Sequence, residues 1–301
     1  MIQCLENGTL ALEHLRQSGE LPPTWQSMAE LEAQVNQLHI RFLEERWRIA
    51  EKRGWGDLAI ELLDRAWRTN DREYMDEEHV SEAEKVTVMQ ALDRQNRLMD
   101  IYNRSANMLL ALCREVPNQP QRPIRVLELA CGSGGLALAL AEMAQRHHLS
   151  LEITASDAVL AYCEEGNAQA KAQQLPVTFR QLDAFHLTDY ANEQYDITVM
   201  SQSLHHFTAG QLAVIIAQAM SQTTTAFVGT DAQRSVLLAG GVPLVASLQA
   251  IPAFALDGFI SARKFYSEPE LALIAESATR RCNYTISRDW PLSVLTVRGG
   301  E

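Results

Sequence analysis

Two adjacent histidines, His205 and His206, lie in the segment MSQSLHHF, directly after an apolar run at residues 195–201. A neutral imidazole has a pKa close to working pH, so it can take a proton from a hydroxyl group that acts as a nucleophile. Because adjacent side chains point in different directions, we expect only one of the two to face a site. The alternative for each is a structural hydrogen bond within a loop.

A glycine-rich turn follows the apolar run at residues 124–129, in the segment IRVLELACGSGG. Gly132, Gly134 and Ala137 fit the G-x-G-x-x-A spacing of a strand-to-helix turn that holds an adenosine cofactor, although a tight turn without a ligand has the same pattern. Glu128, late on the strand, would repel a pyrophosphate and attract an ammonium or sulfonium group. The glycines therefore predict the cofactor site, and Glu128 favours a sulfonium donor over a dinucleotide.

Other polar residues follow the ends of neighbouring strands. Asp157 ends the second strand, where a carboxylate can accept hydrogen bonds from ribose hydroxyls or cap the following helix. Ser201 and Gln202 follow the fourth strand. Because ligands bind at the carboxyl edge of such a sheet, we expect these two residues near the cofactor or the substrate.

The composition limits the range of partners. The chain has 301 residues, 47% of them hydrophobic, and a formal net charge of -12. This negative charge disfavours a nucleic acid or an anionic membrane surface as partner, and we expect neither.

Cysteine usage and hydropathy indicate a cytoplasmic protein. The five cysteines are scattered without a CxxC pair, which is typical of reduced thiols and leads us to expect no metal site. The N-terminal residues lack the pattern of a secretory signal, and glycines and prolines interrupt the most apolar stretch, residues 236–256.

The hydrophobic periodicity predicts an α/β domain after a helical region. Helical spacing at residues 28–50 and 57–67, and again at 81–112 as one long helix or two broken near Asn103, contrasts with the later alternation of strands and helices. We predict strands near residues 124–129, 151–156, 177–181, 195–201, 225–230, 283–287 and 292–298, and helices near 135–147, 158–173, 208–220 and 267–278. The last two strands are separated by a short turn and must form an antiparallel hairpin.

We predict two regions along the chain. Residues 1–115 form a helical region for capping or dimerisation, and residues 120–301 form the cofactor-binding domain, with a linker at 117–123 between them. A long insertion at about 232–266 reads as a lid over the substrate.

The segment ELACGSGG resembles the first motif of class I S-adenosylmethionine-dependent methyltransferases, with Ala130 where that motif often has glycine. The SLHH segment resembles the LHH segment of many small-molecule methyltransferases in this superfamily. The resemblance covers about residues 120–301. It implies a Rossmann-like, seven-stranded, mostly parallel sheet with a C-terminal antiparallel hairpin, which follows an N-terminal α-helical region. It also implies S-adenosyl-L-methionine as cofactor and S-adenosyl-L-homocysteine as product.

The resemblance assigns further roles. Asp183, in QLDAF, corresponds to the family's contact with the adenine amine, the backbone of Ala184 reads the ring edge, and Phe185 packs on the ring or in the core. Asp231, in VGTDAQRS, corresponds to an acid that accompanies the histidines; a turn or an ion pair with Arg234 is the alternative. Glu128 and the 132–135 turn then hold the amino-acid and sulfonium end of the cofactor.

Candidate substrate contacts come from two places. The lid carries apolar residues, among them Phe254, and ends in Arg263 and Tyr266, so it favours an aromatic or hydrophobic small molecule. Tyr102 belongs to the helix before the domain, which in this superfamily commonly crosses the cleft. The alternative for the apolar lid is packing against the N-terminal helices or against a second subunit, and a homodimer is therefore plausible.

These features predict methyl transfer to a small molecule, most simply at oxygen, with His205 or His206 as general base and Asp231 beside it. A nicotinamide-dependent oxidoreductase is the alternative that the glycine spacing alone allows. A non-catalytic, cofactor-binding regulatory or scaffold protein is the other. The identity of the methyl acceptor is not encoded in any recognisable motif.

Overall fold

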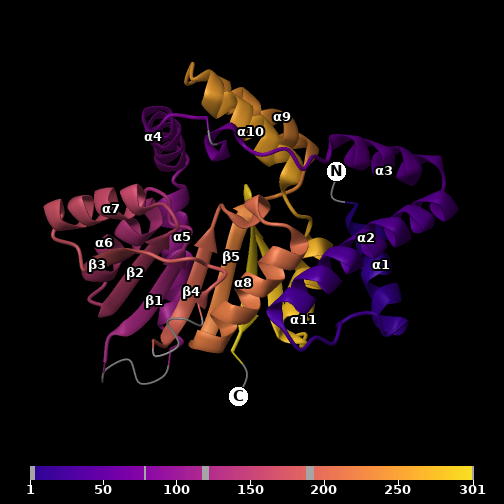
Figure 1. Cartoon of the computed structure of the whole chain (residues 1–301), viewed down its shortest axis with the longest axis horizontal. Coiled ribbons are helices and arrows are strands. Elements are labelled where there is room, and N and C mark those ends of the chain that lie inside the picture. Colours follow the sequence, from indigo (N-terminus) through magenta and orange to yellow (C-terminus); the bar gives the residue numbers. More distant parts are fainter. Residues whose placement is uncertain (1–3, 78, 117–121, 188–192, 300–301) are drawn as a thin grey trace. The chain divides into compact units, whose positions relative to one another are not determined.

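The computed structural model describes residues 4–77, 79–116, 122–187 and 193–299 (Figure 1). The chain forms two compact units that interleave along the sequence. The first unit contains residues 1–79, 202–217 and 230–297, and the second contains residues 80–201, 218–229 and the C-terminal residues from 298. The linear division at 115–120 stays a prediction, and most of the predicted linker, residues 117–121, lies outside the described residues.

Seven strands form one sheet in the order β3-β2-β1-β4-β5-β7-β6. β1 pairs in parallel with β2 and β4, β2 pairs in parallel with β3, and β6 and β7 form the predicted antiparallel hairpin. The predicted fold class is thereby confirmed. The strands are β1 (Ile124–Leu129), β2 (Leu151–Asp157), β3 (Val177–Gln181), β4 (Tyr195–Ser201), β5 (Thr223–Ala232), β6 (Tyr284–Asp289) and β7 (Leu292–Arg298).

In the second unit, helices cover the parallel strands. Helix α6 packs against α5 and β2, and α7 packs against β2 and β3. Every residue of β1 except Arg125 is buried, which is expected for a parallel strand covered on both faces. The helices of this unit are α4 (Glu82–Leu98), α5 (Ile101–Cys113), α6 (Gly135–Arg146) and α7 (Leu160–Ala172).

The predicted helix at 81–112 is two helices. Asp100 has φ 57°, a left-handed conformation that α-helical backbone does not contain, and it separates α4 from α5 three residues before the position expected.

The first unit contains the remaining helices. They are α1 (Leu5–Gln17), which the sequence analysis did not predict, α2 (Met28–Arg53), α3 (Trp55–Trp67), α9 (Val236–Ser247), α10 (Pro252–Lys264) and α11 (Glu268–Thr279). The predicted lid therefore consists of two helices, α9 and α10, which pack against each other (Figure 1). Helix α8 (Ala209–Gln222) begins in this unit and ends in the second.

The spacing of Thr208 with Gln211 and of Ser267 with Glu270 predicts two capping boxes, and the structure contains both. The backbone N–H of Thr208 donates to Gln211 and that of Gln211 donates back to the Thr208 hydroxyl, and Ser267 pairs with Glu270 in the same way before α11. No helix among the described residues is long and apolar enough to cross a membrane.

The buried face of α3 differs from the prediction. Leu62 and Leu63 are 51% and 64% exposed, whereas Glu61 and Asp64 are fully buried. The apolar periodicity correctly indicated a helix but not the side that packs inward, because the acids on the other side form buried ion pairs.

Candidate active site

The predicted cofactor turn, between β1 and α6, contains left-handed backbone. Ala130, Gly132 and Gly134 have φ angles of 51°, 51° and 75°. A Cβ atom at Gly134 would also lie 2.1 Å from the ring of Phe179, so only glycine fits there. Ala130 adopts a conformation that glycine adopts more easily, which explains physically why glycine is frequent at this position of the motif.

Asp157, at the end of β2, holds this turn in place. Its two carboxylate oxygens accept hydrogen bonds of 2.9 Å from the backbone N–H groups of Gly132 and Val159. Val159 directly precedes α7, so the carboxylate supports the start of that helix, as the alternative role required. The predicted contact of Asp157 with ribose hydroxyls stays a prediction.

Glu128 is buried beside the turn. It is 3% exposed, and its Oε2 accepts no hydrogen bond from the described residues. Burial raises the pKa of Glu128 to about 8, against the lowering effect of a hydrogen bond from the Ala137 backbone. A buried carboxyl oxygen without a donor fits a cationic ligand group, such as the ammonium of S-adenosylmethionine.

The third predicted cofactor segment follows β3. The Asp183 carboxylate accepts the backbone N–H of Phe185 at 2.9 Å and faces His186 Nδ1 at 2.8 Å. Burial opposes the change, but these two contacts lower the pKa of Asp183, so it is ionised at neutral pH. Ala184 and Phe185, like Ser201 at the end of β4, are half-buried. Their predicted adenine and methionine contacts stay predictions.

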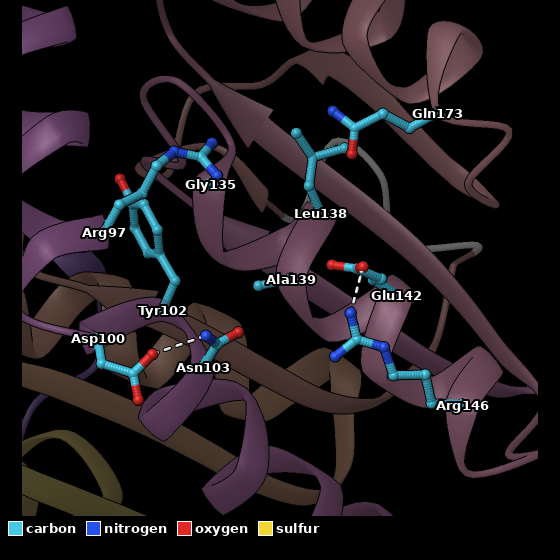
Figure 2. Close-up of a pocket in the computed structure, with 10 residues that line it drawn as sticks. All are labelled: Arg97, Asp100, Tyr102, Asn103, Gly135, Leu138, Ala139, Glu142, Arg146 and Gln173. Atoms are coloured by element: carbon cyan, nitrogen blue, oxygen red, sulfur yellow. Dashed lines mark hydrogen bonds and ion pairs between the residues drawn. The ribbon is translucent and has the colours of Figure 1, made fainter.

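Tyr102 lies in the second unit, beside a pocket of about 280 Å³ between α5 and α6 (Figure 2). Its hydroxyl accepts a hydrogen bond of 3.3 Å from Asn96, and its ring lies where a Cβ atom of Gly135 would be, 2.4 Å away. The ring therefore packs on the first turn of α6. A contact with substrate stays a prediction.

The histidines belong to the first unit, and His205 is enclosed there. It lies in a short 3-10 helix, Leu204–His206, and is 7% exposed. Its Nδ1 is 2.8 Å from Oδ2 of Asp231, and that oxygen also accepts the His205 backbone N–H at 2.9 Å. Its Nε2 is 3.4 Å from Oε1 of Glu73. Asp231 thus accompanies a histidine, and the alternative ion pair with Arg234 is not formed, because Arg234 pairs with Asp64.

His206 has a similar arrangement but is more exposed, at 28% of its side chain. Its Nε2 is 3.7 Å from Oε2 of Glu73, and its Nδ1 is 3.4 Å from Oδ2 of Asp76. Glu73 therefore lies between the two imidazoles. We call Glu73, His205 and His206 the histidine cluster.

The acids and bases of the cluster shift one another's pKa values. Burial alone would lower the pKa of His205, but the carboxylates of Asp231 and Glu73 raise it to about 10. Burial alone would raise the pKa of Glu73, but the two histidines and Lys264, whose Nζ is 3.5 Å from Oε1, lower it to about 2. At neutral pH His205 is therefore an imidazolium, which is not the protonation state of a general base.

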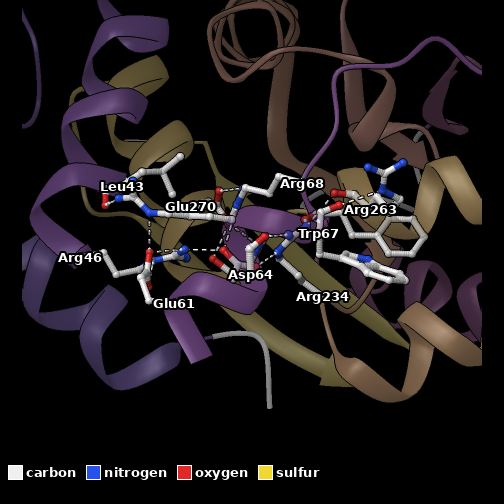
Figure 3. A network of polar contacts seen from close by, with 12 residues as sticks. Leu43, Arg46, Glu61, Asp64, Trp67, Arg68, Arg234, Arg263 and Glu270 are labelled. Carbon is white, nitrogen blue, oxygen red and sulfur yellow. Dashed lines mark hydrogen bonds and ion pairs between the residues drawn. The ribbon is translucent and has the colours of Figure 1, made fainter. Parts of the chain in front are cut away.

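A buried ion-pair network supports the segments that carry the cluster (Figure 3). Asp64 on α3 pairs with Arg46, Arg68 and Arg234. Arg234 also donates to the carbonyl groups of Arg263 and Phe265, at 3.0 and 2.9 Å. The network thus connects the chain before Glu73, the chain after Asp231 and the chain around Lys264.

Arg68 completes the network on the side of α11. Its guanidinium forms two hydrogen bonds, of 2.7 and 3.1 Å, with the fully buried Glu270. Glu270 is the residue that caps α11 through Ser267. Such a pairing compensates for the burial of several charges, and removal of one partner would leave the others unbalanced.

The cluster opens on a cavity of about 760 Å³ within the first unit. Both histidines, Asp76 and Lys264 line it, together with Arg263 and Tyr266 as predicted substrate contacts. The Tyr266 hydroxyl donates to the Phe207 carbonyl at 2.7 Å. Phe254, the other predicted contact on α10, is 5% exposed and is not among the residues that line this cavity.

Sequence reasoning missed Glu73 and Asp76. Both lie in the polar segment at 68–76, which looked like a simple connection. Three acids in the stretch DREYMD were the only signal, and acids are common in connections. Burial of Glu73, at 3% exposed, is what makes it a candidate site residue.

Part of the chain matches a known protein family. Residues 126–225 match the family described as "Methyltransferase domain". No curated protein matches the chain.

Similar solved structures include the plantazolicin methyltransferase BpumL in complex with SAH (S-adenosylhomocysteine), with a TM-score of 0.55 at 12% identity over 73% of this chain and 92% of that chain. The plantazolicin methyltransferase BamL, in complex with a triazolic desmethylPZN analog and SAH, has a TM-score of 0.51 at 13% identity over 70% of this chain and 90% of that chain. The DszA carbon methyltransferase has a TM-score of 0.50 at 17% identity over 66% of this chain and 54% of that chain. At these identities the likeness concerns the fold.

Residues 126–225 therefore match a methyltransferase domain, as the resemblance of ELACGSGG predicted, and the chain shares the fold of these solved methyltransferases. The predicted enzyme class, a methyltransferase, agrees with this match, and S-adenosylmethionine as methyl donor stays a prediction. The match to a methyltransferase domain does not support the oxidoreductase that the glycine spacing alone allowed, whereas the non-catalytic, cofactor-binding protein stays an untested alternative.

Proposed function

We propose that this enzyme transfers the methyl group of S-adenosylmethionine to a hydroxyl oxygen of a small molecule. The observation that carries the proposal is the histidine cluster, whose two imidazoles line a cavity of about 760 Å³ and contact the buried carboxylate of Glu73. A hydroxyl group must lose its proton as its oxygen is methylated, and such a cluster suits that step better than it suits a carbon or amine acceptor.

In this proposal the acceptor binds in the cavity with its hydroxyl group at His206. Of the two histidines expected to act as base, His206 is the more exposed, whereas His205 already holds a proton between two carboxylates. Glu128, the 132–135 turn, Asp157 and Asp183 hold the cofactor. The transfer itself needs the acceptor oxygen, the methyl carbon and the sulfur in line.

The expected aromatic or hydrophobic acceptor is retained. The cavity lining combines apolar side chains, Ile40, Leu43, Phe207 and Tyr266, with the polar cluster. A molecule with a hydroxyl group on an aromatic or aliphatic body matches that combination.

The test is methyl transfer from labelled S-adenosylmethionine to panels of phenols, aliphatic alcohols, amines and carbon nucleophiles of similar size. We expect labelled product with hydroxylated acceptors, and loss of turnover in His206→Ala with unchanged affinity for S-adenosylhomocysteine. Arg146→Met, an exposed change in the second unit, is the control. Product with amines or carbon nucleophiles alone would overturn the assignment to oxygen.

A further inference from the structure

The donor atoms of the histidine cluster converge on one point. One ligand atom from each of Glu73, His205 and His206 lies within 4.8 Å of the others. The Nε2 atoms of the histidines are 3.4 and 3.7 Å from the two carboxylate oxygens of Glu73. Ligands around a transition-metal ion, each about 2.0–2.2 Å from it, are separated by about 3.0–3.5 Å. Small side-chain movements therefore suffice for shared coordination.

Both imidazoles are oriented in the same way. Nδ1 of His205 faces Asp231 at 2.8 Å, and Nδ1 of His206 faces Asp76 at 3.4 Å, while each Nε2 faces Glu73. A carboxylate on the far ring nitrogen fixes the tautomer and the ring of a metal-binding histidine and increases its basicity. Asp231 is itself held, because its other oxygen accepts the backbone N–H of Ala232 at 2.8 Å.

The charge balance around Glu73 favours an added cation. Glu73 is 3% exposed, and its Oε1 has no hydrogen-bond donor in good geometry among the described residues. Asp76, Asp231 and Asp257 are further carboxyl groups around the cluster, and the ammonium of Lys264, 3.5 Å from Oε1, and the protonated ring of His205 are the cations that face Glu73 among the described residues. Buried carboxylates are stable only when cations or donors compensate them.

We propose that Glu73, His205 and His206 bind a divalent first-row transition-metal ion, with Asp231 and Asp76 as outer carboxylates. Two imidazole nitrogens and one carboxylate suit Zn²⁺, Fe²⁺, Co²⁺ or Ni²⁺, whereas Mg²⁺ and Ca²⁺ prefer oxygen ligands throughout. The ion replaces Lys264 and the proton on Nε2 of His205 as the positive charge beside Glu73. The scattered cysteines led us to expect no metal site, and Glu73 lies far from the two histidines along the chain.

The inference deepens the proposed function and rests on it for the position of the acceptor. Three protein ligands leave a coordination position on the cavity side, where His206 is exposed. With the ion bound, His206 is a ligand and no longer the base. The hydroxyl group would lose its proton to water, its oxygen would form a bond to the methyl carbon, and the carbon–sulfur bond would break with the electron pair left on sulfur. Alcohol and S-adenosylmethionine thus give methyl ether, S-adenosylhomocysteine and one proton.

Metal binding is measured without turnover. The full chain, freed of metal by a chelator and dialysed, is titrated with Zn²⁺ by calorimetry and with Co²⁺ by visible absorption. We expect one equivalent bound and the d–d bands of a protein-coordinated Co²⁺. Glu73→Gln and His206→Ala should each weaken binding at least tenfold, whereas Lys264→Met should not weaken it.

The chain supplies a matched control, since His147 and His148 are also adjacent but lie exposed after α6. The double variant His147→Ala/His148→Ala should bind Zn²⁺ like the wild type. Unchanged affinity for S-adenosylhomocysteine and an unchanged circular-dichroism spectrum establish that Glu73→Gln and His206→Ala are folded; if either is not, the milder Glu73→Asp and His206→Asn take its place.

Failure of the wild type to bind either ion would overturn the site, as would equal binding by the folded cluster variants. Full methyl transfer by the chelated enzyme would overturn the metal's role and leave O-methylation standing. Stoichiometric metal binding without transfer to any hydroxylated acceptor would remove the proposed function and leave the metal site.

Discussion

Glu128→Gln is expected to make the protein more stable at alkaline pH and to weaken its hold on the cofactor. Glutamine has nearly the same shape as glutamic acid and cannot ionise. In the folded protein, burial raises the pKa of Glu128 to about 8 from its ordinary 4.5. The substitution therefore removes a group that folding keeps protonated.

The sign and size follow from proton linkage. Between pH 4.5 and 8 the unfolded chain has lost the Glu128 proton and the folded protein retains it, so the free energy of unfolding falls as pH rises through this window. At 1.36 kcal/mol per pH unit the loss is on the order of 5 kcal/mol by pH 8. Glu128→Gln lacks this loss, so its advantage grows from nearly nothing at pH 4 to several kcal/mol at pH 8.

The same substitution, Glu128→Gln, should weaken binding of the cofactor. An ammonium group at Oε2 would stabilise the ionised carboxylate, and a hydrogen bond to a charged group contributes about 1.5–3 kcal/mol. The variant should bind S-adenosylhomocysteine roughly 10- to 100-fold more weakly.

The assay is urea unfolding at half-unit steps from pH 4.5 to 8.5, and calorimetry with S-adenosylhomocysteine at pH 7.5. Glu152→Gln, whose side chain is 59% exposed on β2, is the matched control and should follow the wild type. A stability difference that does not vary with pH would refute the buried titration. Equal affinity of variant and wild type would refute the contact with the ammonium group.

Three further substitutions test the cofactor turn and the ion-pair network. Ala130→Gly removes a Cβ atom from a left-handed position, so thermal unfolding should show equal stability or a gain of up to about 1 kcal/mol. The control Ala137→Gly, within α6, should lower the stability by about 1 kcal/mol, and a clear loss of stability in Ala130→Gly would contradict backbone strain at position 130. Gly134 has φ 75°, and Gly134→Ala adds a Cβ atom 2.1 Å from the ring of Phe179. We expect the stability to fall by about 3 kcal/mol and calorimetry to show weaker binding of S-adenosylhomocysteine, and wild-type values would disprove this packing. Arg234→Met removes one partner of the buried Asp64 carboxylate and should lower the free energy of unfolding in urea by about 3–5 kcal/mol. The exposed control Arg146→Met should lower it by less than about 1 kcal/mol, and similar losses in both variants would show that the network does not depend on Arg234.

The cofactor half of the site was predictable because its signals are local. An apolar run, a turn that needs left-handed backbone and a following helix lie within residues 124–146, and the acids at the strand ends occur at regular positions. Backbone sterics and strand geometry determine these patterns over a few residues, so they can be read in a single sequence. The same is true of the two capping boxes and the C-terminal hairpin.

Tertiary structure alone decided the other half. Glu73 is an ordinary surface residue by type until packing buries it between His205 and His206, which lie far along the chain. The acids of α3 are buried because Arg46, Arg68 and Arg234, from three separate segments, lie around Asp64. The stability of a buried charge depends on partners brought together only by the fold, and periodicity in one segment contains no information about them.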